Sequence, residues 1–278
     1  MDIGKQGERP VAAAVGPEEH SEHRRILGIS FFVGSVKDAI SRMKSGGLLV
    51  VPAAPALLEL STKQTYREAL LSADLVIPDS GFMVLVWNLI ARDSVVRLSG
   101  LAYLRELLKW PAVRVPGSTF WVMPNERSAE RNIAWLRTQG LEVSDDDYSI
   151  APLFSGSVTD PVLLSKLEER RPQHVIIALG GGTQECLGLY LRDKLAYKPS
   201  IHCIGAALAF LSGDQVGVPV WADKLYLGWL FRCLSNPSRF IPRYFKALKV
   251  APLLLRYRTE LPELDTVRPQ HELPTFTE

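Results

Sequence analysis

Residues 174–185 read HVIIALGGGTQE, and this stretch decides the fold. Its β-branched apolar residues are typical of a buried strand, three glycines permit a tight turn, and Thr-Gln-Glu opens a helical pattern. Short apolar runs followed by longer helical patterns recur on both sides of it. Such alternation predicts an α/β fold with a Rossmann-like, mostly parallel sheet and helices on both faces.

Working outward, the sequence offers further strands and helices of the same kinds. The predicted strands are 27–33, 47–52, 74–78, 118–123, 174–180 and 200–205, with 141–150 as a further candidate. The predicted helices are 35–44, 55–72, 80–91, 100–109, 127–139, 160–170 and 183–196. Beyond residue 222 the pattern becomes helical only, with proline at 242 and 252 predicted to bend or interrupt the last helix.

The composition is that of a globular protein. Of 278 residues, 47% are hydrophobic and 22% are charged, which excludes disorder as the main state. Three scattered cysteines favour a reducing compartment. The N-terminal stretch lacks the apolar region of a signal peptide, and no run is long enough to span a membrane. We therefore expect a soluble or peripheral protein.

The net charge of +2 conceals an asymmetry. Between Lys224 and Arg258 there are eight Lys or Arg residues and no acid, so this segment carries +8 and the remainder −6. We predict four regions on this basis. They are a flexible arm (1–25), an α/β core (26–222), a basic amphipathic helical appendage (223–258) and a disordered acidic tail (259–278).

Asp79 follows the predicted strand 74–78, at the edge of the sheet where α/β proteins bind ligands. Its carboxylate could act as a general base facing a cleft. The structural alternative is an N-cap of the next helix, a common use of aspartate.

The glycines after residue 179 would let a ligand approach the backbone, and the helix that follows presents N–H groups suited to phosphate. The stretch lacks the third glycine of a dinucleotide fingerprint, because Glu185 stands there. A tight turn without a ligand is the alternative.

Asp145 and Asp147 have the Asp-X-Asp spacing that holds Mg²⁺ or Mn²⁺ in many nucleotide-sugar enzymes. An acidic surface turn explains the same residues. The five histidines show no metal-ligand spacing.

The basic segment interleaves its cations with large apolar residues. Arg232, Arg239 and Arg243 would share one face of a continuous helix and could hold a diphosphate. The segment also suits an anionic membrane surface. Solvated charge on a packed helical hairpin is the alternative, and the acidic remainder argues against nucleic acid.

Four blocks in this order resemble the WecG/TagA/CpsF family of bacterial glycosyltransferases, from about residue 27 to residue 258. The blocks are YREALLSADLVIPDSG (66–81), VVRLSGLAYLRELL (95–108), LGGGTQE (179–185) and GWLFRCLSNPSRFIPRY (228–244). The resemblance implies inverting, metal-independent transfer of a sugar from a UDP-sugar to a polyprenyl-diphosphate-linked glycolipid, at the cytoplasmic face of the inner membrane. No cofactor is expected, and a homo-oligomer is left open.

By this resemblance Asp79 is the general base, Gln184 contacts substrate, and Arg97 and the C-terminal arginines face diphosphate. The predicted substrate-binding residues are Arg97, Gly180, Gly181, Gln184, Glu185, Gly205, Arg232, Arg239 and Arg243. The predicted membrane-contacting residues are Lys246, Lys249, Arg256 and Arg258.

The sequence departs from the family at the turn after the second strand. The family's Thr/Asn-containing turn is replaced by the apolar Pro52-Ala53-Ala54-Pro55. This leaves two other hypotheses open: a catalytically inactive, membrane-associated partner in polysaccharide assembly, and a metal-dependent nucleotide-sugar enzyme using Asp145 and Asp147.

Overall fold

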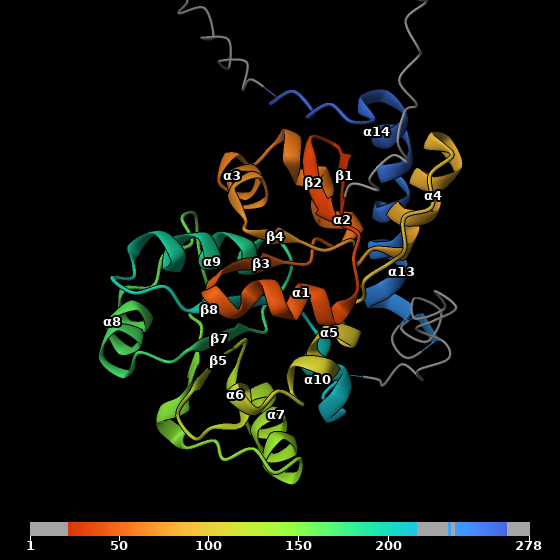
Figure 1. Ribbon diagram of the computed structural model, residues 1–278. Helices are drawn as coiled ribbons and strands as arrows, with labels where there is room; N and C mark the ends of the chain where they lie inside the picture. The colour runs from red at the N-terminus through yellow and green to blue at the C-terminus, as the bar shows by residue number, and fades with distance from the viewer. Residues whose placement is uncertain (1–21, 216–232, 235–236, 266–278) are drawn as a thin grey trace, which may run out of the picture.

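The computed structural model describes residues 22–215, 233–234 and 237–265, without the side chains of residues 239, 240 and 243. One eight-stranded sheet runs through the molecule in the order β1-β2-β4-β3-β8-β7-β5-β6 (Figure 1). All neighbouring pairs are parallel except β1 and β2. The strands are β1 (His23–Ile26), β2 (Ile29–Phe32), β3 (Gly47–Val50), β4 (Leu75–Val76), β5 (Thr119–Met123), β6 (Tyr148–Ile150), β7 (His174–Ile177) and β8 (Ser200–Cys203).

Helices connect these strands. The α-helices of the core are α1 (Val36–Arg42), α2 (Ala54–Leu57), α3 (Gln64–Ser72), α4 (Gly81–Ala91), α5 (Gly100–Leu107), α6 (Pro111–Arg114), α7 (Glu126–Thr138), α8 (Pro161–Arg170), α9 (Thr183–Lys194) and α10 (Ala207–Ser212). Short 3₁₀ turns are η1 (Met43–Ser45), η2 (Leu58–Ser61) and η3 (Asp145–Asp147). The C-terminal helices are α13 (Pro237–Leu248) and α14 (Val250–Tyr257).

The central strands are buried on both faces, as an α/β fold requires. Alternate residues of β3 enter different cores: Leu48 and Val50 pack with α2, α3, α4, α8 and α9, whereas Leu49 packs with α1, α5 and α7. The predicted α/β class and mostly parallel sheet are therefore confirmed.

The element boundaries differ from the prediction in places. β1 was missed and begins at His23, inside the expected arm, because this edge strand is only partly apolar and pairs antiparallel with β2. The expected helix 55–72 is broken into α2, η2 and α3. In the C-terminal part the helix continues through Pro242, and the break falls at Lys249. Pro252 lies in the first turn of α14, where its missing N–H costs no helical bond.

The C-terminal helices dock on the core beside α2 and α4 (Figure 1). Ala247, Val250 and Leu254 are buried in the same apolar cluster as residues of those two helices. Residues 224–232, expected to form a helix, lie outside the described residues.

The first residues of the expected acidic tail have a definite path. Leu27 donates its backbone N–H to the carbonyl of Arg258 at 2.7 Å, and Gly28 donates to Thr259 at 3.0 Å. Further on, Asp265 donates to the carbonyl of Ser61 at 2.7 Å. Residues 259–265 thus run along the core, because their backbone groups find partners there.

Candidate functional site

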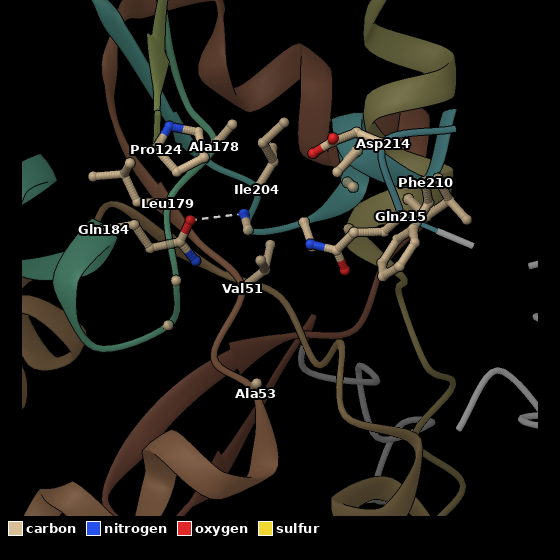
Figure 2. Close-up of a pocket in the computed structure, with 18 of the residues that line it drawn as sticks. Val51, Ala53, Pro124, Ala178, Leu179, Gln184, Ile204, Phe210, Asp214 and Gln215 are labelled. Atoms are coloured by element: carbon tan, nitrogen blue, oxygen red, sulfur yellow. Dashed lines mark hydrogen bonds between the residues drawn. The ribbon is translucent and has the colours of Figure 1, made fainter. Parts of the chain in front are cut away.

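A cavity of about 430 Å³ opens at the carboxyl ends of β3, β4, β5, β7 and β8 (Figure 2). The chain leaves β3 and β4 to one side and returns to build β5 and β7 on the other, so this edge is the switch point of the sheet. The cavity is lined by Val51, Ala53, Asp79, Arg97, Ser99, Gly100, Leu101, Pro124, Asn125, Arg127, Ser128, Asn132, Ala178, Leu179, Gly180, Gly181, Gln184, Ile204, Gly205, Ala206, Ala207, Ala209, Phe210, Asp214 and Gln215.

Asp79 lies in this cavity and does not cap the helix that follows it. Ser80 is the N-cap of α4 and accepts the N–H of Met83 at 3.2 Å. The carboxylate of Asp79 accepts the N–H of Gly100, the first residue of α5, at 2.9 Å through Oδ1. Oδ2 has no hydrogen-bond partner among the described residues, and 28% of the side chain is exposed. The arrangement leaves one carboxylate oxygen available to a ligand hydroxyl.

Arg97 is bound to the same aspartate. Its Nε donates to the main-chain oxygen of Asp79 at 2.5 Å, and one terminal nitrogen lies 3.6 Å from Oδ1. Arg97 was predicted to face the diphosphate, and the structure places it at the cavity beside Asp79. The N-terminus of α5 adds partial positive charge at this point.

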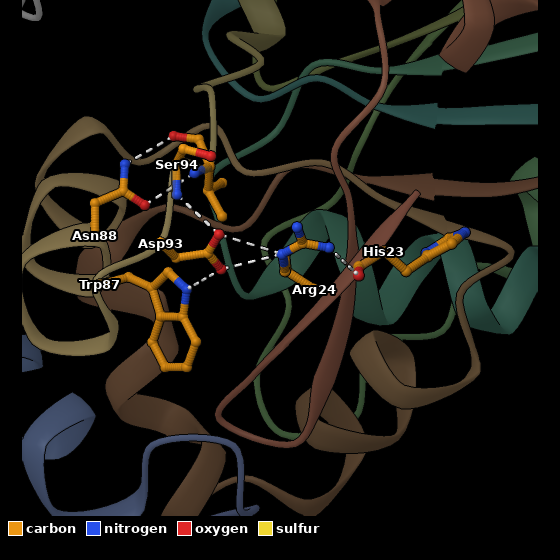
Figure 3. A network of polar contacts seen from close by, with 7 residues as sticks. His23, Arg24, Trp87, Asn88, Asp93 and Ser94 are labelled. Carbon is orange, nitrogen blue, oxygen red and sulfur yellow. Dashed lines mark hydrogen bonds and ion pairs between the residues drawn. The ribbon is translucent and has the colours of Figure 1, made fainter. Parts of the chain in front are cut away.

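The loop between α4 and α5, which carries Arg97, is fixed by a polar network (Figure 3). The carboxylate of Asp93 accepts from Arg24 at 3.1 Å, from the indole N–H of Trp87 at 3.2 Å and from the N–H of Ser94 at 2.8 Å. Partial burial raises the pKa of Asp93, but these hydrogen bonds outweigh it and leave the pKa below its ordinary value. Asn88 holds the loop further by two 2.9 Å bonds to the backbone of Val95.

Gln184 contacts the cavity from α9 but is held by protein groups. Its Oε1 accepts the N–H of Gly205 at 2.7 Å (Figure 2), and its Nε2 donates to Glu185 at 3.0 Å. The side chain is 1% exposed. Gln184 therefore ties the turn after β7 to the turn after β8. Gly180, Gly181 and Gly205 bring their backbones to the cavity wall beside it.

Glu185 does not line the cavity. It is fully buried and accepts the N–H of Gly182 at 2.6 Å, which closes the N-terminus of α9. Burial raises the pKa of this carboxyl to about 7, although hydrogen bonds from Gln184 and Gly182 oppose the shift. Its role in this arrangement is to position the glycine turn and Gln184.

Three predicted arginine side chains, those of the C-terminal segment, lie outside what the structure describes. Arg232 lies outside the described residues, and Arg239 and Arg243 belong to α13 with side chains that are not described. The four predicted membrane-contacting cations are all exposed: Lys246, Lys249, Arg256 and Arg258.

The acidic turn is η3, next to edge strand β6 and away from the cavity lining. Asp147 is buried, accepts the N–H of Ser144 at 2.8 Å and pairs with Arg170. Asp145 faces Arg137 at 3.5 Å. Among the described residues no cluster of His, Cys, Asp or Glu could hold a metal ion. Both carboxylate oxygens of Asp147 already contact protein groups, so these residues do not fit the hypothesis of a metal site.

Several lining residues were missed by sequence analysis. Asn125 caps α7 by accepting the N–H of Ser128 at 2.9 Å, and Arg127 is exposed in the first turn of that helix. Asp214 and Gln215 reach the cavity from the chain after α10. A cap signal Asn-X-X-Ser is present at 125, but nothing in the sequence indicates that α10 would return Asp214 to this site.

The apolar turn after β3 forms part of the wall. Val51 and Ala53 line the cavity, and Ala56 lies under Gly181. The departure from the family pattern therefore leaves this wall without polar side chains between Asp79 and Gln184.

A mostly parallel sheet with a cavity at its switch point is the arrangement in which α/β proteins bind their ligands. Comparison with known proteins gives the family. The family model described as "Glycosyl transferase WecG/TagA/CpsF family" matches residues 24–263. The chain belongs to this family and is a glycosyltransferase.

Two similar proteins share the printed name N-acetylglucosaminyldiphosphoundecaprenol N-acetyl-beta-D-mannosaminyltransferase. The one from Bacillus spizizenii is 25% identical over 211 residues, which are 73% of this chain and 79% of that protein. The one from Bacillus subtilis is 24% identical over 185 residues, which are 64% of this chain and 70% of that protein.

Proposed function

We propose that this protein transfers a sugar, a hexose, N-acetylhexosamine or uronic acid, from a UDP-sugar to a polyprenyl-diphosphate-linked glycolipid, with inversion and without a metal ion. The observation that carries the proposal is Asp79, whose carboxylate is held at the N-terminus of α5 inside the cavity with Oδ2 directed to no described partner. The names of the two relatives, both transferases to a diphosphoundecaprenol glycolipid, support the acceptor class.

The proposed reaction is a single displacement. Asp79 removes the proton of the acceptor hydroxyl while its oxygen attacks the anomeric carbon. The bond from that carbon to the diphosphate breaks on the opposite face, and UDP leaves with the bonding electrons. Arg97 and the backbone N–H groups of Gly180 and Gly181 supply positive charge for the departing diphosphate.

The test is product formation with a panel of UDP-sugars and a short-chain polyprenyl-diphosphate glycolipid, with the anomeric configuration read by NMR. Asp79→Asn should fold, bind UDP and lose transfer, whereas Asp38→Asn, an exposed capping aspartate of α1, should keep it. Full transfer by Asp79→Asn would remove the proposed base, and absence of UDP binding by the wild type would contradict the donor. EDTA should leave the rate unchanged.

We further propose that α13 and α14 rest on the cytoplasmic face of the inner membrane. No helix among the described residues is long and apolar enough to cross a membrane. Large apolar side chains are nevertheless exposed beside the cations of these helices: Ile241, Phe245, Leu248 and Leu255. From Pro237 to Arg258 there are six Lys or Arg and no acid. Such a surface suits anionic headgroups.

Flotation with vesicles containing anionic lipid tests this surface. Changing Lys246, Lys249, Arg256 and Arg258 to Gln should abolish vesicle binding and leave turnover on a soluble acceptor analogue. The matched control changes four exposed lysines elsewhere, Lys37, Lys109, Lys166 and Lys198. Equal loss in both variants would show only a general charge effect and would contradict the proposal.

A further inference from the structure

The cavity contains a second carboxylate that the proposed chemistry does not use. Among the residues that line it, the acids are Asp79 and Asp214. Asp79 follows β4, whereas Asp214 lies beside the N-terminal turn of α7, the helix that follows β5. In the sheet β4 and β5 are separated by β3, β8 and β7, which are four strand steps or roughly 19 Å. Asp79 and Asp214 therefore reach the cavity from different elements.

The carboxylate of Asp214 is held in place by two side chains of α7. Its Oδ2 accepts the hydroxyl of Ser128 on α7 at 2.7 Å, and Arg131 lies 3.7 Å from Oδ1. The side chain is 11% exposed. A carboxylate fixed in this way is preorganised to accept further hydrogen bonds at its open edge.

The backbone conformation around Asp214 directs this residue towards the cavity. α10 ends at Gly213, whose φ of +77° lies in the left-handed region that favours glycine. The N–H of Gln215 then donates to the carbonyl of Ala209 at 2.9 Å, and Ser212 donates to Asn132 of α7 at 2.5 Å. The turn is thus closed by hydrogen bonds and returns Asp214 to the cavity. Figure 2 shows Asp214 and Gln215 across the cavity from Gln184 and Leu179.

The order of groups along the cavity matches a nucleotide-sugar. The anomeric carbon must lie near Asp79, and the diphosphate would then meet the glycine turns after β7 and β8. The next unit is the ribose, which falls beyond those turns towards β5. A ribose carries two neighbouring hydroxyls, and an ionised carboxylate only accepts hydrogen bonds, so the two are complementary.

We propose that Asp214, positioned by Ser128, binds the ribose hydroxyls of the nucleotide donor. This assignment rests on the proposed function, because it requires a ribonucleotide in the cavity. The competing explanation is that Asp214 only links α10 to α7. The two differ in one respect: a ribose contact makes the effect of the substitution depend on the hydroxyls of the ligand.

The experiment is calorimetric titration of the full chain with UDP, 2′-deoxy-UDP and 3′-deoxy-UDP. The wild type should bind at least one deoxy analogue about 10- to 100-fold more weakly than UDP, the range for a hydrogen bond to a charged group. In Asp214→Asn that discrimination should shrink to about threefold or less, through weaker UDP binding with the binding of that analogue unchanged. Ser128→Ala, which keeps the carboxylate but frees it, should reduce discrimination less.

Each of the following results would overturn the assignment of Asp214 to the ribose. Equal weakening of all three nucleotides in Asp214→Asn would show a structural link alone. A wild type that binds UDP and both deoxy analogues equally would exclude the ribose contact without any variant, even if Asp214→Asn failed to fold. A wild type that binds no UDP would contradict the proposed function itself and the assignment with it.

Discussion

Each side of the cavity carries an aspartate and an arginine, but the two aspartates are held differently. On the β4 side (Asp79, Arg97, Ser99 and Gly100) the carboxylate of Asp79 uses one oxygen, and 28% of the side chain is exposed. On the β5 side (Asn125, Arg127, Ser128, Asp214 and Gln215) the carboxylate of Asp214 contacts protein groups through both oxygens, and 11% is exposed. A base needs an oxygen open to the reacting proton, whereas a binding group needs a fixed direction. We therefore propose that the β4 side carries the chemistry and the β5 side binds the donor.

Matched Asp→Asn substitutions on the two sides give the largest expected difference. Asp79→Asn should lower kcat by about 10²- to 10⁴-fold, the contribution of a general base, with the Kd for UDP little changed. Asp214→Asn should act mainly on Kd and KM. Steady-state kinetics and calorimetry on both variants provide the measurement. If Asp214→Asn caused the larger fall in kcat, the assignment of the two sides would have to be exchanged.

A smaller effect is expected from Arg97→Lys on the β4 side. Lysine keeps the charge but cannot hold the main-chain oxygen of Asp79 while reaching the carboxylate, as the guanidinium does. We expect kcat to fall about 10- to 100-fold, equivalent to one charge-assisted hydrogen bond. Arg105→Lys on α5 is the matched control and should keep full kcat, since Arg105 is absent from the cavity lining.

On the β5 side, Arg127→Gln should weaken binding rather than slow the reaction. The Arg127 side chain makes no hydrogen bond or ion pair with the described residues, so its charge is available to a phosphate. We expect the Kd for UDP to rise by about tenfold while the Kd for uridine stays constant. Calorimetry with both ligands checks this. An equal loss for uridine would show that Arg127 does not contact phosphate.

The smallest effect concerns Glu185, beneath the glycine turn that joins the two sides. Its folded-state pKa of about 7 lies above that of an unfolded glutamate, 4.5. The stabilisation from the protonated carboxyl is therefore fully present below about pH 4.5 and is lost as the pH rises through about 7. Its complete loss lowers the free energy of unfolding by about 3 kcal/mol.

Glu185→Gln tests this contribution by differential scanning calorimetry. Subtracting the Tm of the variant from that of the wild type cancels the other titrating groups, and this difference should fall by several degrees between pH 5 and pH 8. A difference that stayed constant with pH would show that Glu185 does not titrate in this range.

Much of the fold was predictable because local pattern and tertiary environment agree. The central strands are runs of Val, Ile and Leu, and such runs are stable only when both faces of a sheet are covered. β1 was missed for the opposite reason: its sequence HRRI is stabilised by pairing with β2 and by the Arg24–Asp93 contact, neither of which leaves a local pattern.

For the site, sequence identified Asp79, Arg97, Gly180, Gly181, Gln184 and Gly205 as cavity residues, because each follows a strand or stands in a block shared with the family. It could not show that Gln184 is held by Gly205, or that Glu185 is turned away from the cavity. Those facts depend on distances between segments far apart in the chain.

The sequence by itself determined the α/β class, the base candidate and the basic C-terminal segment, since these follow from periodicity, position after a strand and charge. Only the tertiary structure showed that Asp79 accepts a hydrogen bond from α5 rather than capping α4, and that Asp214 returns to the cavity. The physical reason is that hydrogen bonds such as Asp79 to Gly100 and Ser128 to Asp214 join residues 21 and 86 positions apart. A local stretch of sequence does not predict such pairs, because they form only when the helices pack on the sheet.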